Sequence, residues 1–332
     1  MSVLVIGAGG WVGSAVCASA AADGLQVHGL TRRPAPHLEA HAKVHVGDAR
    51  RNFLGLDEDE AEQLADEVTS VVVSVGSFDL SVPLAKAQSE HVVPLRGALR
   101  FAKSCTQLKN VVLVSSLLAT GDVRQRMRSD YDPDHGKQRN FYEWAKIQGE
   151  RVARGSGLPV DIVRAGHVLA GSDELARPAK PQAVFELLRV LFAGWPLPVM
   201  GSNRYWSLPS DFCAQVVLDR VKHGTGGSSV WAVDPASPTL AEILDLVNVK
   251  YGARAKRIRH HGLARSLAAV VRPHWLDLPM EREVFDYCTA HWDLELSCLN
   301  ELVDAGRVTV PADRGYLVRT LDQEIARLRE LP

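Results

Sequence analysis

Two residues on a predicted helix have the types and the spacing needed for proton transfer. Tyr142 and Lys146 stand four positions apart in a segment of helical character that runs to about Ser156. Positions i and i+4 lie on one face of a helix, one turn apart. A phenol with an ordinary pKa of about 10 exchanges protons poorly at neutral pH, but a neighbouring ammonium group stabilises the phenolate. The pair therefore predicts acid/base chemistry at Tyr142, although a single pair of this kind also arises by chance.

A glycine-rich turn near the N-terminus predicts a cofactor site. The apolar run Val3–Ile6 is followed by Gly7, Gly10 and Gly13 and then by an alanine-rich helical segment. Strand, glycine turn and helix in this order form a dinucleotide site, where a pyrophosphate lies against backbone N–H groups at the helix N-terminus. Gly-x-x-Gly-x-x-Gly fits the turn, whereas Gly-x-Gly-x-x-Gly fails at Val12. The predicted cofactor-binding residues here are Gly7, Gly9, Gly10, Trp11, Val12 and Gly13.

The end of the second predicted strand, Leu25–Leu30, indicates which dinucleotide is bound. Thr31, Arg32 and Arg33 follow this strand, with no acidic residue among them. An acidic side chain at this point accepts hydrogen bonds from the ribose hydroxyls of NAD, whereas arginine pairs with the 2′-phosphate of NADP. We therefore expect NADP, as NADPH, to be the cofactor, with a solvated basic turn as the alternative.

Together these motifs resemble the extended branch of the short-chain dehydrogenase/reductase (SDR) superfamily. The resemblance covers essentially the whole chain, and the layout is closest to the thioester-reductase and fatty-acyl-reductase group and to the NAD-dependent epimerase/dehydratase group. It implies a Ser-Tyr-Lys site in which Ser116 is the catalytic serine, Tyr142 the acid/base, and Lys146 its partner, which also reaches the nicotinamide ribose.

The same resemblance implies further contacts to the cofactor. Asp48, in the pair Gly47-Asp48, is expected at the adenine. The remaining residues expected along the cofactor are Ser74, Val75 and Gly76 after the fourth strand, and Ala165, Gly166, His167 and Val168 beside the nicotinamide.

Two positions depart from the family pattern. Ala165 replaces the usual proline, which loosens the backbone there. His91 stands where an asparagine usually supports a proton relay. Histidine donates and accepts hydrogen bonds, so His91 either takes over a relay through water or is a packed core histidine. The sequence leaves both interpretations open.

A basic stretch between the serine and the tyrosine bears on the substrate. Arg124 and Arg128 belong to it, and the matching segment of the family borders the substrate. Cations beside a carbonyl site suit an anionic substrate, such as a phosphopantetheine group, whereas interleaved aspartates also fit a solvated loop. Ser115 and Leu117, beside Ser116, complete the expected substrate contacts together with His91.

The composition is that of an ordinary globular protein. The chain has 332 residues, 46% of them hydrophobic, and a formal net charge of -1, so nothing points to nucleic acid or a membrane as a partner. The apolar start is too short for a signal peptide, which predicts a cytoplasmic protein. Five scattered cysteines form no C-x-x-C pair, and no metal site is predicted. A homodimer is an oligomeric state that the sequence allows.

Alternating strand and helix patterns predict the fold. Short valine-rich runs such as Ser70–Val75 and Asn110–Ser116 are typical of strands buried on both faces of a parallel sheet. We therefore expect an α/β protein with a doubly wound Rossmann domain at residues 1–170, which also contains a returning segment at 207–235. A smaller, mainly helical substrate lobe is expected at 171–206 and 236–332.

These features predict an NADPH-dependent oxidoreductase that transfers hydride to a carbonyl group of a ketone, aldehyde or thioester. An epimerase or dehydratase of nucleotide sugars, in which the hydride is taken and returned, is the alternative within enzymes. A catalytically silent NADP-sensing or partner-binding relative is the alternative outside them, and the presence of Ser116, Tyr142 and Lys146 counts against it.

Overall fold

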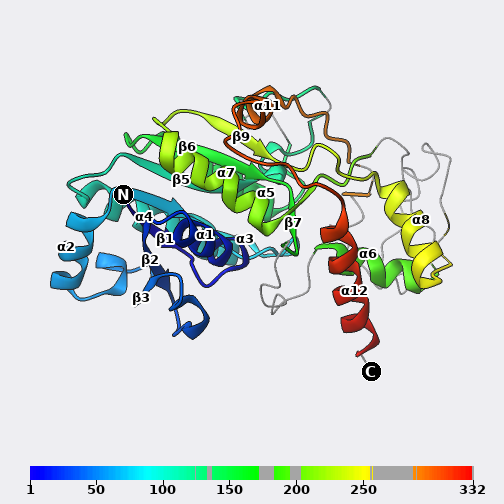
Figure 1. Ribbon diagram of the computed structural model, residues 1–332, viewed down its shortest axis with the longest axis horizontal. Helices are drawn as coiled ribbons and strands as arrows, with labels where there is room; N and C mark the ends of the chain where they lie inside the picture. The colour runs from blue at the N-terminus through cyan, green and yellow to red at the C-terminus, as the bar shows by residue number, and fades with distance from the viewer. Residues whose placement is uncertain are drawn as a thin grey trace.

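Seven parallel strands form the central sheet, in the order β3-β2-β1-β4-β5-β6-β9 (Figure 1). The computed structural model describes residues 1–123, 125–132, 137–171, 183–194, 203–254, 256, 287–288 and 290–330. The chain moves outward in opposite directions from β1 and β4, so the predicted doubly wound sheet is confirmed. The strands are β1 (Ser2–Ile6), β2 (Gln26–Thr31), β3 (Lys43–Val46), β4 (Ser70–Val73), β5 (Asn110–Ser116), β6 (Val160–Ala165) and β9 (Ser229–Ala232).

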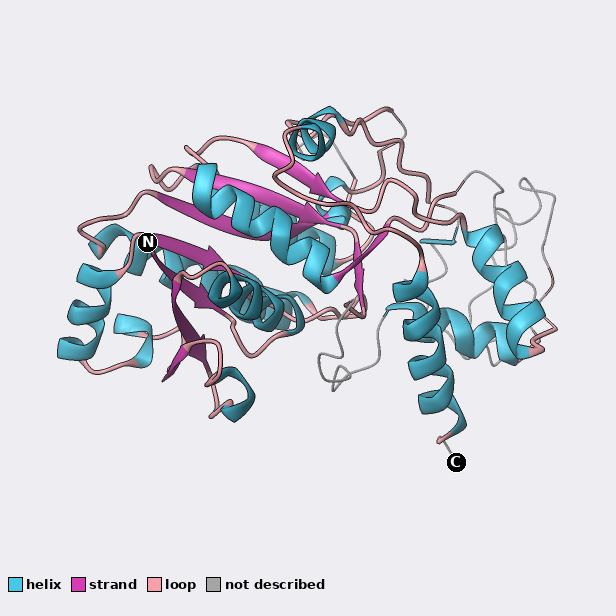
Figure 2. Ribbon diagram, viewed as in Figure 1, coloured by secondary structure: helices cyan, strands magenta, loops and turns pink. Residues whose placement is uncertain are grey.

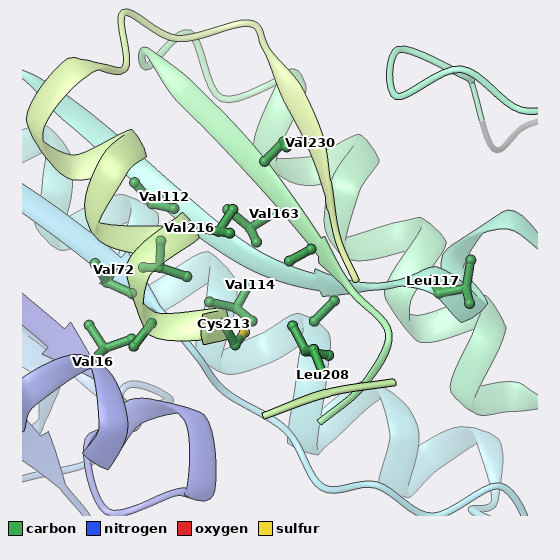
Figure 3. Close-up of a cluster of buried hydrophobic side chains, with 14 of the residues drawn as sticks. Val16, Val72, Val112, Val114, Leu117, Val163, Leu208, Cys213, Val216 and Val230 are labelled. Atoms are coloured by element: carbon green, nitrogen blue, oxygen red, sulfur yellow. The ribbon is translucent and has the colours of Figure 1, made fainter. Parts of the chain in front are cut away.

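Helices cover both faces of this sheet. On one face, α1 (Trp11–Ala22) packs against α7 (Ser210–His223), and on the other lie α2 (Glu58–Glu67), α4 (Val93–Ser104) and α5 (Phe141–Arg154). Alternate residues of each strand enter the two resulting cores, so Val112 and Val114 lie on the α7 side while Val111 and Leu113 lie on the α4 side. Figure 3 shows Cys213 and Val216 of α7 directed at the valines of the sheet.

The helical periodicity of Pro83–Ser104 predicts one helix, but the segment contains a wider turn. It is divided into α3 (Leu84–Ala87), the π-helical turn η3 (Gln88–Val92) and α4. Pro94 has no N–H to donate to the carbonyl of Glu90, and its ring would clash with that carbonyl in a regular α-helix. The wider turn avoids this clash, and it contains His91. Turns of this kind are frequent at functional sites.

A smaller lobe lies beyond the carboxyl ends of the strands (Figure 2). The helices α6 (Ala183–Phe192), α8 (Leu240–Tyr251) and α12 (Gly315–Arg329) share one apolar cluster. Thr239 caps α8 in a capping box with Glu242. None of the helices in the described part of the chain has the length and apolar composition that a membrane crossing requires.

The connection between the sheet and the lobe differs from the expectation in two ways. Two short strands, β7 (His167–Leu169) and β8 (Ser207–Pro209), pair in parallel. The run Leu208-Pro209-Ser210-Asp211 predicts a serine or aspartate cap for α7, but Pro209 is the N-cap residue and no side chain caps the helix. Because β8 runs directly into α7, Ser210 is already the first helical residue and is buried.

Part of the C-terminal segment packs on the sheet. Trp292 and Leu294, together with Leu299 and Leu302 of α11 (Ser297–Asp304), belong to the cluster on the α7 side. The same segment pairs with Met127, which donates its backbone N–H to Asp293 O at 2.8 Å. Residues from 290 to 308 therefore lie against the Rossmann core, although the sequence assigned them to the lobe.

Candidate functional site

The predicted acid/base pair lies at the start of α5, at the carboxyl edge of the sheet. Asn140 fixes this helix end because its Oδ1 accepts the backbone N–H of Glu143 at 2.9 Å. Tyr142 is therefore in the first turn of α5, and Lys146 lies one turn further on. Ser116 is the last residue of β5, so strand and helix bring the three predicted residues together.

Burial sets the protonation of Tyr142 and Lys146. Tyr142 is 5% exposed, and Lys146 Nζ lies 5.8 Å from the centre of its ring. Burial raises the pKa of Tyr142 to about 12, and a hydrogen bond with the Ser116 side chain opposes this. Burial lowers the pKa of Lys146 to about 8, opposed by the Glu150 carboxylate. Both groups are thus held nearer to their neutral forms, and the pKa of Tyr142 lies above its ordinary value, whereas the sequence predicted a phenolate stabilised by the Lys146 ammonium.

His91 lies directly against the tyrosine. Its ring meets the Tyr142 ring edge-on, with the ring centres 5.4 Å apart. A Cβ atom on Gly76, whose φ is +110°, would lie 2.2 Å from His91 Nδ1, so the chain after β4 is packed tightly against the imidazole. Within the described residues neither ring nitrogen has a hydrogen-bond partner. Burial and the Lys146 ammonium lower the pKa of His91 to about 3, and the nearby Ser77 backbone opposes this without forming a well-aligned hydrogen bond, so the ring is neutral.

The glycine turn has the geometry that a pyrophosphate needs. Gly7 has φ +91°, and a Cβ atom on it or on Gly13 would lie 2.2 Å from a backbone oxygen. Gly10 is the N-cap residue of α1, no side chain caps this helix, and its first turn holds no acidic residue. The N–H groups there are open to an anion. Trp11 Nε1 donates to Leu169 O at 3.3 Å and so ties the turn to β7.

Three arginines gather around the tip of β2. Thr31 Oγ1 donates to Arg33 O at 2.7 Å, which shapes the turn, and the described residues provide no ion-pair partner for Arg32 or Arg33. Asp48, expected at the adenine, pairs with Arg50, which lowers the pKa of its carboxyl, and Arg32 contributes to this effect. Sequence reasoning missed Arg50, although it stands two residues after Asp48.

The segment expected beside the nicotinamide connects β6 to β7. Ala165 ends β6 and is buried, and a Cβ atom on Gly166 would lie 2.4 Å from Trp206 O. The ring of His167 stacks on Tyr205, with ring centres 4.3 Å apart, and burial lowers the pKa of His167 to about 4. Val168 pairs with Leu208 in the β7–β8 ladder. After β4, Ser74 and Val75 are half-buried and lie next to Gly7 of the glycine turn.

Ser115 and Leu117 flank Ser116, but their side chains are directed inward. Ser115 Oγ donates to Glu150 Oε1 at 2.6 Å, inside the protein. Leu117 is 1% exposed and belongs to the core cluster shown in Figure 3. Of these three neighbours, Ser116 is the one whose hydroxyl meets Tyr142.

Sequence reasoning also missed the buried ion pair behind Lys146. Arg164 donates to Glu150 from Nε at 3.0 Å and from Nη2 at 2.7 Å. The same guanidinium donates to the backbone oxygens of Ser129 and Tyr131. The position of Glu150 near Lys146 could have been predicted from the spacing, because Glu150 follows Lys146 by four residues and lies on the same face of the helix.

The basic stretch is extended chain with its cations on the outer side. Met127 and Ser129 are buried, whereas the Arg128 side chain is 74% exposed and pairs with Asp130 at 3.1 Å. Arg126 is also exposed, and both arginines lie near Glu295. The structure therefore does not bring Arg128 to the Ser116–Tyr142–Lys146 group. Arg124 lies outside the described residues.

Solved structures with the same fold include reductase domains. The terminal R domain from the myxalamid PKS-NRPS biosynthetic pathway has a TM-score of 0.78 and 18% identity, covering 98% of this chain and 90% of its own. A thiolation-reductase di-domain from an archaeal non-ribosomal peptide synthetase has a TM-score of 0.77 and 16% identity, covering 99% and 76%. MoeE5 in complex with UDP-glucose and NAD has a TM-score of 0.65 and 16% identity, covering 99% and 100%. At these identities the likeness shows the fold.

The sequence itself identifies the family. No curated protein matches the chain. A model of the NAD-binding family described as male sterility protein matches residues 20–217, which is more than half of the chain. The chain therefore belongs to the male sterility protein family, within the extended SDR superfamily of NAD(P)-dependent enzymes, as its motifs predicted.

Proposed function

We propose that the chain is an NADPH-dependent reductase that transfers hydride to the carbonyl group of a ketone, aldehyde or thioester. The observation that carries the proposal is the group formed by Ser116, Tyr142 and Lys146 at the carboxyl edge of the sheet, beside an uncapped helix N-terminus. Ligands of doubly wound sheets bind at this edge. The family and the fold of reductase domains support the same reaction class.

In this mechanism the protein supplies a proton and holds the substrate oxygen. Bound NADPH supplies the hydride. Ser116 Oγ accepts the backbone N–H of Leu118 at 3.1 Å, which leaves its own proton to be donated to a carbonyl oxygen. Tyr142 gives its proton to that oxygen, and the Lys146 ammonium stabilises the phenolate that remains.

The choice of NADPH over NADH rests on Arg32, Arg33 and Arg50. A 2′-phosphate takes charge-assisted hydrogen bonds from guanidinium groups. Asp48, whose carboxyl feels the charge of Arg32, is paired with Arg50. Replacing both Arg32 and Arg33 by alanine should weaken NADPH binding by about 1.5–3 kcal/mol and leave NADH binding almost unchanged. Equal affinity of the unaltered protein for the two nucleotides would show that the cofactor assignment is wrong.

The direct test is an assay of NADPH oxidation with an aldehyde, a ketone and an acyl thioester. Thioester substrates are included because a neighbour of the same fold is a thiolation-reductase di-domain. Net consumption of NADPH that is lost in Tyr142→Phe supports the proposal. Conversion of a UDP-sugar without net NADPH consumption would identify the epimerase alternative, for which the fold of MoeE5 is the precedent. Cofactor binding with no turnover of either class would point to a silent sensor.

A further inference from the structure

Glu143 is a completely buried carboxylate next to Tyr142 in the sequence. It is 0% exposed and accepts three hydrogen bonds, each 2.7 Å long. Two come from the backbone N–H and Nη1 of Arg139, and the third comes from the Tyr287 hydroxyl. A buried carboxylate is tolerated only with such partners. The three donors therefore fix where Glu143, and the first turn of α5, can lie.

These donors link three separate parts of the chain. Arg139 Nη2 also donates to Asp122 Oδ1 at 3.1 Å, and Asp122 follows Ser116 by six residues. Asn140 caps α5 through its Oδ1 and donates from Nδ2 to the Tyr287 hydroxyl at 2.9 Å. The segment after Ser116, the start of the tyrosine helix and the C-terminal part of the chain thus meet at one carboxylate.

The contacts of Glu143 with Arg139, Asn140 and Tyr287 form what we call the junction, and aromatic rings lie against it. The Arg139 guanidinium lies over the rings of Tyr287 and Trp292, at 5.3 and 5.7 Å from their centres. Trp206, which precedes β8, donates its indole N–H to Trp292 O at 2.9 Å. The cation is held between a carboxylate and two rings, an arrangement that orients a guanidinium strongly.

We propose that Arg139, Glu143 and Tyr287 are positioning residues, through which the C-terminal segment holds Tyr142 in line with Ser116. This inference rests on the proposed reduction, because it assigns Tyr142 the proton-transfer step. None of the three residues is proposed to touch the substrate. Their contacts set the position of the helix turn that carries the phenol, and a small displacement of a reacting group can cost on the order of 10²-fold in rate.

The junction also predicts opposite effects on the pH dependence. The groups around the Tyr142 phenol are Lys146 on its own helix, Ser116 on β5, His91 on η3 and the neighbouring Glu143. Glu143 raises the pKa of Tyr142, and Arg139 counters the Glu143 charge. In reduction Tyr142 must carry its proton and Lys146 its charge, so the fall in rate at high pH belongs to the pair, and the charges of Glu143 and Arg139 shift it through Tyr142.

Glu143→Gln should therefore shift this fall to lower pH, and Arg139→Gln should shift it to higher pH. A purely structural role would lower the rate in both variants but would not move the two profiles in opposite directions. Arg139→Lys keeps the charge and should restore the position of the profile.

The test compares these variants with Tyr287→Phe and with a matched control, Arg307→Gln. Arg307 also joins the C-terminal segment to the core, through Asp219 at 2.6 Å, but it does so at the opposite edge of the sheet. Tyr287→Phe should lower kcat about tenfold while KM and NADPH affinity stay within about twofold. Its amide hydrogen exchange at residues 141–144 should accelerate, a readout that needs no substrate. Arg307→Gln should lower Tm and change neither exchange at 141–144 nor kcat.

Unchanged kcat and exchange in Tyr287→Phe, or pH profiles that move in the same direction in the two charge variants, would overturn the inference. If Arg139→Gln does not fold, Tyr287→Phe and Glu143→Gln still decide it. Failure of the proposed function is distinguishable, because the unaltered protein would then consume no NADPH or Tyr142→Phe would keep its activity, while hydrogen exchange at residues 141–144 would still test the role of Tyr287. An inactive Tyr142→Phe beside a fully active, normally exchanging Tyr287→Phe would remove this inference alone.

Discussion

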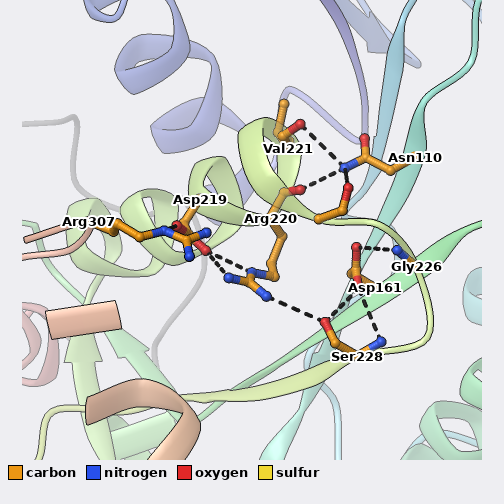
Figure 4. A network of polar contacts seen from close by, with 9 residues as sticks. Asn110, Asp161, Asp219, Arg220, Val221, Gly226, Ser228 and Arg307 are labelled. Atoms are coloured by element: carbon orange, nitrogen blue, oxygen red, sulfur yellow. Dashed lines mark hydrogen bonds and ion pairs between the residues drawn. The ribbon is translucent and has the colours of Figure 1, made fainter. Parts of the chain in front are cut away.

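Polar side chains at the amino edge of the central sheet are paired within the protein more fully than those at the carboxyl edge. At the amino edge, the buried Asp161 at the start of β6 accepts three hydrogen bonds, from the backbone N–H groups of Gly226 and Ser228 and from the Ser228 hydroxyl (Figure 4). Asp219 of α7 accepts from Arg220 and from Arg307. Here the protein pairs its own charges, and the contacts join β6, α7, β9 and the C-terminal segment.

At the carboxyl edge, several polar groups have no partner among the described residues. Neither ring nitrogen of His91 accepts or donates a hydrogen bond there, Lys146 forms no ion pair there, and α1 starts without a side-chain cap. Buried polar atoms without partners are costly. The paired groups at the amino edge stabilise the fold, and under the proposed function the groups at the carboxyl edge would be paired by the cofactor and the substrate.

The largest expected effect is on the rate of reduction, and it follows a change at Tyr142, at the carboxyl edge. Tyr142→Phe removes one hydroxyl that the fold does not need, so Tm and NADPH affinity should stay the same. The rate of carbonyl reduction should fall by a factor of roughly 10²–10⁴, the usual contribution of a positioned acid/base. Steady-state kinetics and thermal unfolding of the same preparation measure both. Substantial activity in the variant would contradict the mechanism.

A large effect of the opposite kind is expected at the amino edge. Asp161→Ala leaves three partly buried donors of Gly226 and Ser228 without their acceptor, so the free energy of unfolding should fall by about 1–3 kcal/mol. The kcat of the molecules that remain folded should be unchanged, because no ligand is expected at this edge. Urea unfolding and active-site-normalised kinetics test the two parts. A loss of kcat without a loss of stability would contradict the conclusion that the amino edge stabilises the fold and takes no part in the reaction.

Most of the sheet could be predicted from the sequence because its strands are short valine-rich runs. The predicted strand at Asn110–Ser116 coincides with β5, and the predicted run Ser70–Val75 contains β4. The β7–β8 pair could not be predicted, since strands of three residues carry no usable periodicity. The wider turn η3 was missed because Pro94 alone does not reveal whether a helix ends or adapts.

The candidate site was predictable only where chemistry depends on local spacing. The order of the glycine turn, the strand-end serine and the Tyr142–Lys146 pair can be read from the sequence, and their roles remain predictions. The junction at Glu143 could not be found in this way, because Tyr287 is far from it in the sequence and is brought there by the fold. The hydrogen bond between Ser228 and Asp161 also joins residues that are far apart in the sequence, so the sequence does not reveal it.

A smaller effect, on the free energy of unfolding, is expected at Lys146, where removal of a charged side chain should stabilise the protein. Its pKa of about 8 in the folded protein lies below the ordinary value, because burial disfavours the ammonium. Between about pH 8 and 10.5 the unfolded chain binds more protons, so stability rises with pH across that range, and the full cost of the charge is present at pH 7.

Lys146→Met should therefore stabilise the protein at pH 7 while abolishing reduction. Since the side chain is partly exposed, we expect a gain of about 1–2 kcal/mol, less than the full shift would imply. The gain should disappear above about pH 10.5. Urea unfolding at pH 7 and at high pH provides the measurement. If Lys146→Met destabilises the protein at pH 7, the folded protein stabilises the Lys146 charge, as it stabilises the paired charges at the amino edge.

The smallest expected effect decides between the two interpretations of His91. If the unpaired ring nitrogens serve the reaction, His91→Phe should lower kcat about tenfold, a loss of about 1.4 kcal/mol in transition-state stabilisation, with Tm retained. His91→Asn should restore part of the rate, because an amide also donates and accepts hydrogen bonds, although it leaves a cavity and lowers Tm. Because the pKa of His91 is about 3, the ring stays neutral above pH 5 and neither variant should alter the pH profile there. A packed core histidine predicts the reverse order: full activity in the phenylalanine variant, which preserves the ring contacts with Tyr142 and Gly76, and the greater loss in the asparagine variant.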